Sequence, residues 1–323
     1  MKRIAVFAAA LLLALAGFAF AQSGYPDKPI RILVGFSAGV APDITSRLFG
    51  DKWTETWAKG VAVENVTGAG GNLAVAQVAK AAPDGYTLAM GGNAALVINP
   101  NLMDKLGYDP LKDFSYITQI FIVPNILVVP ADSPVKSIKE LIALAKEKPD
   151  YFVAGHAGVG TSQHLGGELF MAMTGVKIQQ VPYRGSTQVL PDLLGGRLNI
   201  FFGNISNVLP LIREGKLRAF GITSKQRSPQ IPELPTMEEL GFPGFDATAW
   251  FGLMGPAGLP KPIVDKIHDE TVKVLALPDT RKKLEGMGLQ LVGNTPEQFA
   301  AIVKAEMPMW AKVIKDAGIK PAQ

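Results

Sequence analysis

The chain contains no cysteine among its 323 residues. This absence excludes disulfide bonds, thiolate nucleophiles and zinc sites built from thiolates. Histidine is also scarce, with three copies, and none of them forms the His-Glu-x-x-His pattern of helical zinc sites. We therefore expect a protein with no catalytic residues, no metal site and no cofactor, whose stability depends on a large apolar core.

An excess of one charge is missing as well. The sequence has 32 basic and 28 acidic residues, and without Lys2 and Arg3 the balance is 30 against 28. The basic residues are dispersed rather than gathered in a long run, so the electrostatic footprint of a nucleic-acid-binding protein is absent. We expect no nucleic-acid partner.

Long hydrophobic runs are absent after the first 21 residues. Within those 21 residues, the hydrophobic run Ile4 to Leu15 follows the basic pair Lys2-Arg3 and precedes the small-residue sequence Ala19-Phe20-Ala21. This pattern predicts a cleaved secretory signal peptide over residues 1–21, with an uncleaved N-terminal anchor as the alternative. No cysteine follows it, which excludes a lipid anchor. We expect a soluble protein in the periplasm of a bacterium with two membranes.

What the sequence does contain is a regular alternation of short β-rich runs and helical segments. Residues 30–34, 61–65 and 86–90 are predicted strands, with a helix after each of the first two. This order predicts a parallel sheet with helices on both faces. A similar alternation over residues 125–223 predicts a second α/β unit. Together with the helical segments near the end of the sequence, these units indicate two lobes.

Three glycine-rich loops follow predicted strands, at residues 36–43, 67–71 and 155–161. Open α/β sheets bind ligands beyond the carboxyl ends of their strands, so in two facing lobes these loops would meet in one cleft. The third loop leads into a helix that Thr161 or Ser162 can cap, and a helix N-terminus attracts anions. No Gly-Lys-Ser/Thr follows, which favours a carboxylate over a nucleotide. A tight turn with an ordinary cap is the alternative, and the second loop is predicted to be structural.

The candidate ligand-binding residues come from these loops and from the ends of strands. Asp43 either caps the helix after the first loop or binds an amine, hydroxyl or water of the ligand. Asn93 and Asn204, each just past a strand, either reach the cleft or cap a turn. The predicted ligand-binding residues are Phe36, Ser37, Ala38, Gly39, Asp43, Asn93, His156, Gly158, Val159, Gly160, Thr161 and Asn204.

The three histidines have different surroundings in the sequence. His268 lies in a charged amphipathic segment and is predicted to be on the surface, whereas His164 lies one turn into a helix and is predicted to be a buried hydrogen-bonding residue. His156 lies in a loop of small residues, where we expect its ring to contact the ligand. Ser162, His164 and Asp192 could supply the side chains of a secreted hydrolase, which is the alternative to a binding protein.

A series of longer motifs covers essentially the whole chain after the predicted signal peptide. Together they resemble the Bug solute receptors of tripartite tricarboxylate transporters. The motifs are Tyr-Pro-Asp-Lys-Pro-Ile-Arg-Ile at 25–32, Asn-Val-Thr-Gly-Ala-Gly-Gly at 65–71, Pro-Asp-Gly-Tyr-Thr-Leu at 83–88, Asn-Pro-Asn-Leu at 99–102, Gly-Val-Gly-Thr-Ser-Gln-His-Leu at 158–165, Val-Pro-Tyr-Arg-Gly at 181–185, Asp-Leu-Leu-Gly-Gly at 192–196 and Trp-Phe-Gly-Leu-Met-Gly-Pro-Ala-Gly at 250–258.

This resemblance implies an α/β, two-lobe periplasmic binding protein, similar to the type II class, with two interlobe crossovers and a ligand cleft. One lobe would comprise residues 22–124 and 247–323, and the other residues 125–246. The ligand would be a small di-, tri- or aromatic carboxylate, held by the first and third loops through backbone N–H groups and waters. The receptor, a monomer, would deliver it to membrane permease subunits. Carboxylate sensing for a sensor kinase is the alternative role.

Two positions depart from the pattern of the family that the chain resembles. Val40 replaces the second glycine of the first loop, which restricts the backbone there. His156 stands where the family commonly has serine, and an imidazole can donate to a carboxylate or stack on an aromatic ring. From this substitution we derive the hypothesis that the ligand is an aromatic dicarboxylate.

Overall fold

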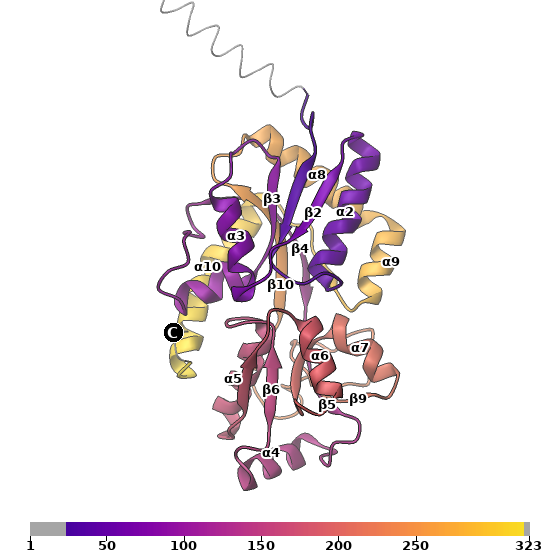
Figure 1. The fold of residues 1–323 in the computed structure, drawn as a ribbon, viewed down its shortest axis with the longest axis vertical. Coiled ribbons are helices and arrows are strands. Elements are labelled where there is room, and N and C mark those ends of the chain that lie inside the picture. The colour runs from indigo at the N-terminus through magenta and orange to yellow at the C-terminus, as the bar shows by residue number, and fades with distance from the viewer. Residues whose placement is uncertain (1–23, 320–323) are drawn as a thin grey trace, which may run out of the picture.

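A six-stranded sheet forms the core of the larger of two groups of elements in the computed structural model, which describes residues 24–319 (Figure 1). The predicted signal peptide lies outside the described residues. The strand order is β11-β4-β10-β3-β1-β2. The elements of this group are β1 (Ile30–Val34), α2 (Ala41–Trp57), β2 (Val61–Asn65), η1 (Ala69–Gly71), α3 (Asn72–Ala79), β3 (Thr87–Gly92), η2 (Ala94–Ile98), η3 (Asn99–Asn101), β4 (Phe114–Val123), β10 (Ala249–Pro256), α8 (Lys261–Ala276), α9 (Pro278–Gly286), β11 (Gln290–Leu291) and α10 (Pro296–Asp316).

The strands whose direction the sequence predicted are parallel, and the rest of the sheet is mixed. As predicted, β1 pairs in parallel with β2 and β3. The sheet is mixed beyond these strands, because β10 is antiparallel to both β3 and β4. β4 runs toward the smaller group of elements and β10 runs back from it. The carboxyl ends of β1, β2, β3 and β4 therefore face that group.

The smaller group contains two short sheets. Its strand β5 lies between β8 and β9 in an antiparallel sheet, while β6 and β7 are parallel. A bridge between Ala154 and Ile200 links the two sheets. The elements are β5 (Asn125–Pro130), α4 (Ile138–Glu147), β6 (Val153–His156), α5 (Ser162–Thr174), β7 (Gln179–Pro182), α6 (Ser186–Leu194), β8 (Phe201–Asn204), α7 (Ile205–Arg213) and β9 (Leu217–Ile222).

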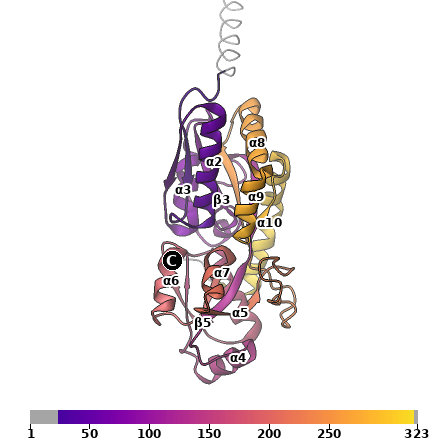
Figure 2. The same cartoon turned by 90° about the vertical axis from the view of Figure 1, so that its right-hand side faces the viewer.

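The two groups are stacked end to end along the long axis of the molecule, as Figures 1 and 2 show from perpendicular directions. Pro124 alone separates β4 from β5, and the chain returns to the larger sheet between β9 and β10. These two changes of sheet support our proposed lobe boundaries at 124/125 and 246/247, which remain a proposal.

The first glycine loop is shorter than predicted, because α2 begins at Ala41 and not at Ile44. Pro42 suits the first helical turn, where its missing N–H costs no intrahelical bond, and the negative charge of Asp43 is favourable at a helix N-terminus. Val40, the residue before α2, has φ −92° and ψ 165°, an extended conformation that valine adopts readily. A second glycine is therefore not required for this backbone shape.

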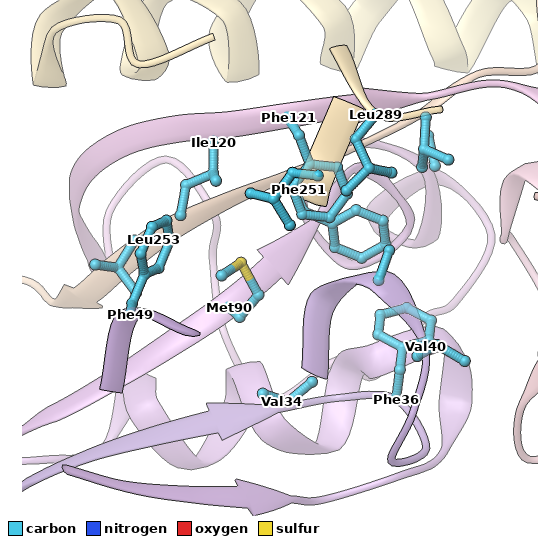
Figure 3. Packing of buried hydrophobic residues seen from close by; sticks show 14 of the residues in the cluster. Val34, Phe36, Val40, Phe49, Met90, Ile120, Phe121, Phe251, Leu253 and Leu289 are labelled. Carbon is cyan, nitrogen blue, oxygen red and sulfur yellow. The ribbon is translucent and has the colours of Figure 1, made fainter. Parts of the chain in front are cut away.

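The apolar core of the larger group reaches the region between the two groups. Phe36 packs edge to face on Phe251 with ring centroids 5.4 Å apart, and Phe251 lies 5.1 Å from Phe121. Figure 3 shows these rings in one cluster with Val40 and Leu289. The first loop is thus anchored by its own aromatic residue. In the part of the chain that the structure describes, we find no helix with the length and apolar character needed to cross a bilayer.

Candidate functional site

A cavity lies where the carboxyl ends of the large-sheet strands meet the smaller group of elements. The cavity has a volume of about 30 Å³, and the wider depression around it, which includes open solvent, has about 530 Å³ free of protein atoms. Among residues 24–319, no charged side chain belongs to the lining. The residues that line the cavity are Phe36, Ser37, Val40, Ala41, Pro42, Gly92, Asn93, Ala94, Val123, Ala157, Thr161, Ser162, Gln163, Ser186, Asn204, Ala249 and Phe251.

The helices α2, α5 and α6 begin at this cavity. Ala41 and Pro42 belong to the first turn of α2, Ser162 and Gln163 to that of α5, and Ser186 is the first residue of α6. The first N–H groups of a helix have no partner within it, and together they carry a partial positive charge. The cavity is therefore electropositive, although no lysine or arginine lines it.

A network of uncharged side chains covers the side of the cavity formed by the smaller group. The Gln163 amide nitrogen donates to Ser186 Oγ at 2.7 Å and to Asn204 Oδ1 at 3.2 Å. Gln163 Oε1 accepts from the Ala157 backbone N–H at 2.9 Å, and Asn204 donates to Asn125 Oδ1 at 2.7 Å. These bonds fix the orientation of each amide. Hydroxyl and N–H groups can therefore be presented to a ligand in a fixed arrangement.

The opposite wall is apolar. Phe36 and Phe251 form it together with Val123 and Ala249 from the two strands that connect the groups of elements. Trp250 is not part of the lining, because its indole N–H points to Glu306 Oε2 at 2.8 Å. One face of the cavity thus offers hydrogen bonds and the other offers aromatic and aliphatic surface.

The three glycine loops meet, as the sequence predicted. A Cβ atom on Gly70 would lie 2.8 Å from Val159 O, and one on Gly158 would lie 2.8 Å from Gly70 N. A Cβ on Gly185 would overlap the hydroxyl of Ser37, which would have to rotate away. We call these contacts the interlobe seam. It leaves no room for side chains, which explains why the second loop is rich in glycine.

Asp43 holds the first loop in place and is not part of the lining. Its carboxylate accepts from Gly39 N at 2.9 Å, from the Arg47 guanidinium at 3.1 Å and from Asn65 Nδ2 at 2.9 Å. Asn65 also donates to Phe36 O at 2.9 Å. Burial alone would raise the pKa of Asp43, but these hydrogen bonds outweigh burial, and its pKa lies below the ordinary value.

The predicted site residues fall into two sets. Five of them line the cavity: Phe36, Ser37, Asn93, Thr161 and Asn204. The others lie in the same loops or at their ends but outside the lining, and ligand contact by them remains a prediction: Ala38, Gly39, Asp43, His156, Gly158, Val159 and Gly160.

Asn93 and Thr161 illustrate how the lining residues combine two roles. Asn93 Oδ1 accepts from Ala94 N at 3.1 Å and its amide donates to Thr248 O at 3.0 Å. Thr161 is the N-cap of α5 and accepts from His164 N at 3.4 Å. Both side chains thus cap a helical turn at the edge of the cavity, so the two alternatives that the sequence left open for Asn93 are compatible.

Sequence reasoning missed Gln163, Ser186 and Phe251. Gln163 had an available signal, because it lies two residues after the predicted helix cap, where a side chain is close to the N-terminus of the helix. Ser186 and Phe251 come from segments far away in the sequence, and no local pattern connects them with the loops.

His156 and His164 are both buried, and neither lines the cavity. Burial lowers the pKa of His156 to about 4. Burial, with repulsion from His156, lowers the pKa of His164 to about 3. Both rings are therefore neutral near pH 7. The prediction of a buried, hydrogen-bonding His164 is confirmed, since its Nδ1 accepts from Gly160 N at 3.3 Å. His268 is a partly buried residue whose Nδ1 lies 3.0 Å from Asp269.

The candidate hydrolase side chains do not form a catalytic arrangement. Asp192 binds Tyr183 Oη at 2.7 Å and Arg197 at 3.0 Å, not His164. Residues 35–39, Gly-Phe-Ser-Ala-Gly, match the Gly-x-Ser-x-Gly spacing after a strand, a signal that the sequence expectations overlooked. Ser37, however, lies in the interlobe seam beside Gly185, and His156 and His164 use Nδ1 to accept backbone N–H groups. Among residues 24–319 there is also no group of three or more metal-ligating side chains.

Comparisons with known proteins agree with this geometry. The family model described as "Tripartite tricarboxylate transporter family receptor" matches residues 45–319. Protein BugT of Bordetella pertussis is 34% identical over 313 residues, covering 96% of each chain.

Solved structures are similar over nearly the whole described chain. Periplasmic binding protein BugD has a TM-score of 0.87 at 34% identity, covering 92% of this chain and 99% of its own. A protein of R. palustris solved with adipate has a TM-score of 0.88 at 34% identity, covering 92% and 100%. MatC of Rhodopseudomonas palustris, with bound malate, has a TM-score of 0.85 at 32% identity, covering 90% and 100%. The predicted α/β binding-protein fold is confirmed.

Proposed function

Because the chain belongs to the tripartite tricarboxylate transporter receptor family, we propose that it binds one small carboxylate between its two lobes and delivers it to the membrane subunits of such a transporter. The chain is a solute receptor and not an enzyme. Its site of action is the periplasm, after removal of residues 1–21, and it acts there as a monomer. The similarity to periplasmic binding protein BugD supports this location.

The observation that carries the proposal is the convergence of three helix N-termini on an uncharged cavity. Ser162, Gln163 and Ser186 open two of these helices, and Ala41 and Pro42 open the third. Each helix end stabilises a nearby negative charge by about 0.3–1 kcal/mol at the surface and by more where water is excluded. A cation would be repelled by the same groups. The site therefore favours an anion, and its hydroxyl and amide donors suit a carboxylate.

The apolar wall narrows the class of carboxylate. Phe36, Val123 and Phe251 cannot hydrogen-bond to a hydroxyl group of a ligand, so a ligand with an apolar body fits this wall better than a polyhydroxylated one. A relative solved with adipate has such a ligand. The aromatic dicarboxylate hypothesis now rests on these rings rather than on His156, whose ring is outside the lining.

Thermal unfolding of the mature chain with adipate, terephthalate, malate, citrate and aspartate tests the proposal. A ligand that binds only the folded state stabilises it by about 2.7 kcal/mol at a hundredfold excess over Kd. We expect the largest rise in Tm with adipate or terephthalate. Ala249→Leu, which fills the cavity, should abolish the rise, whereas Ala301→Leu on the exposed face of α10 should not. Stabilisation by neutral sugars or cations, and by none of the acids, would overturn the proposal.

Delivery is tested in cells. Deletion of the gene should abolish uptake of the stabilising carboxylate, and expression of the full 323-residue chain should restore it. Unchanged uptake, with loss of a transcriptional response to the same carboxylate, would instead indicate a sensory role.

A further inference from the structure

The two buried histidines form an arrangement that the proposed function does not yet explain. His156 lies at the end of β6 and His164 in the first turns of α5, and their ring centroids are 4.6 Å apart at an angle of 40°. His156 Nδ1 accepts from Gly158 N, and His164 Nδ1 accepts from Gly160 N, each at 3.3 Å. The two imidazoles therefore hold alternate residues of one loop from the same side.

The loop that they hold is the part of the smaller lobe that forms the interlobe seam. Gly158 lies against Gly70, and a Cβ on Gly160 would overlap the Asn99 side chain. Thr161, the next residue, lines the cavity and caps α5. The conformation of residues 158–160 thus decides both how closely the lobes approach and where the N-terminus of α5 points.

The hydrogen bonds also determine the charge state of the rings. A ring nitrogen that accepts from a backbone N–H carries no proton, so both histidines act here as neutral imidazoles with the proton on Nε2. His164 Nε2 lies 3.5 Å from Glu168 Oε1, which is consistent with an N–H directed at this carboxyl. Burial and, for His164, repulsion between the two rings oppose protonation, in the same direction as the geometry.

The charged and titratable groups around the pair are few. Glu168 on α5 faces His164 and also accepts from Gln180 of β7 at 3.4 Å. Tyr183, after β7, donates its backbone N–H to His156 O, and its hydroxyl is bound to Asp192 of α6. The segments η1, η3 and β8, which complete the surroundings, carry no titratable side chain.

We propose that His156 and His164 are positioning residues of the ligand site: as a neutral pair they hold Gly158 and Gly160 in the conformation that the closed lobes require. This inference rests on the proposed function, because its effect on binding is exerted through the carboxylate cleft. Protonation of either ring removes an acceptor and places two N–H donors against each other. The loop then loses its support, and ligand affinity falls in acid.

The experiment compares substitutions that keep or remove the acceptor. In His156→Asn and His164→Asn, the side-chain oxygen takes the place of Nδ1 and cannot be protonated, whereas leucine provides no acceptor. Affinity for adipate and for malate is measured by calorimetry from pH 8 to pH 4. Because the ligands titrate in the same range, each variant is compared with the unmodified chain at the same pH. His268→Asn serves as the matched histidine control.

We expect His156→Leu and His164→Leu to bind about fivefold more weakly at pH 7, the effect of one lost hydrogen bond. The asparagine variants should bind within about twofold of the unmodified chain at pH 7. The double asparagine variant should bind more tightly than the unmodified chain near pH 4, while His268→Asn follows the unmodified chain. Leucine variants that bind normally, or an asparagine pair with the same acid loss, would overturn the inference.

A second measurement separates this inference from the proposed function. Hydrogen exchange of the Gly158 and Gly160 amides is recorded at pH 7 without ligand. Protection should be present in the unmodified chain and in the asparagine variants and be lost in the leucine variants, whose folding is checked by circular dichroism. If no carboxylate binds, the proposed function fails, and the exchange pattern still decides the role of the histidines. Equal protection in all folded variants would refute it.

Discussion

The first and third glycine loops line the same cavity and precede helices, yet they are held by different chemistry. Asp43, Arg47 and Asn65 hold the first loop through a charged carboxylate that accepts from Gly39 N. The third loop is held by two neutral imidazoles that accept from Gly158 N and Gly160 N. A backbone N–H can thus be bound by a charged or a neutral acceptor. Because only the imidazoles gain a proton between pH 7 and pH 4, we expect the third loop to be more sensitive to acid than the first.

The largest effect that we expect is a loss of free energy of unfolding in acid, caused by the two histidines that hold the third loop. The folded-state pKa of His156, about 4, lies below its value of about 6.5 in the unfolded chain, and that of His164 is about 3. Between these values the unfolded chain binds more protons, so stability is present above pH 6.5 and is lost as pH falls toward 4.

From pH 7 to pH 5 we expect a loss of free energy of unfolding on the order of 2 kcal/mol per histidine. Urea unfolding of the unmodified chain and of His156→Asn/His164→Asn at both pH values measures this loss by difference. The double variant should lack it. The same pH dependence in both proteins would show that the pair is not the source.

We expect a smaller loss of stability when Asp43, the charged residue that holds the first loop, is substituted. Asp43→Ala leaves Gly39 N and one of the two amide N–H groups of Asn65 without their acceptor, and bonds to a charged group are worth about 1.5–3 kcal/mol. We expect urea unfolding to show a loss of about 2–3 kcal/mol and adipate binding to weaken. Asp51→Ala, at an exposed position of the same helix, is the control and should change stability by less than about 0.5 kcal/mol. A loss no greater than that of the control would mean that the carboxylate does not hold the loop.

The role of the interlobe seam in ligand binding can be tested without changing Asp43 or the two histidines. Gly185 has an extended backbone that alanine can adopt, but its Cβ would overlap the Ser37 hydroxyl. Gly185→Ala should therefore leave the free energy of unfolding nearly unchanged and weaken adipate binding about tenfold, the effect of modest overpacking. Gly60→Ala, where nothing lies within 4 Å of the added atom, is the control. Equal affinities of the two variants would contradict the closed seam.

The sequence predicted the supports of the cavity better than its lining. The strands β1, β2 and β3, their directions and the meeting of the three loops follow from strand–loop–helix patterns, because parallel strands place their carboxyl ends at one edge. β4 was missed although residues 114–123 are rich in isoleucine and aromatic residues.

The orientation of His156 could not be predicted. A ring in a loop of small residues can point toward a ligand or pack inside the protein, and the sequence near it does not distinguish the two. Its partner His164 is in a separate helix, and the contact arises only when β6 and α5 pack together. For the same reason Gln163 and Ser186, which are hydrogen-bonded at 2.7 Å, have no common signal in the sequence.

The smallest expected effect concerns the residue that starts each helix. α5 has Thr161 as its N-cap, and the same hydroxyl donates to Gly158 O at 2.7 Å, whereas α2 has Val40 at this position and no side-chain cap. Thr161→Val, which keeps the shape, should lower the free energy of unfolding by about 1 kcal/mol. The reciprocal Val40→Thr should change it by less than about 0.5 kcal/mol, because the new cap bond offsets the burial of a hydroxyl.

Guanidinium unfolding of both variants measures the difference between the two helix starts. Equal losses would mean that Val40 contributes only its volume and that the caps do not distinguish the loops. A loss confined to Thr161→Val would mean that the third loop depends on its own hydroxyl as well as on the histidines. The first loop would then depend on Asp43, Asn65 and the packing of Phe36, and not on a side-chain cap of α2.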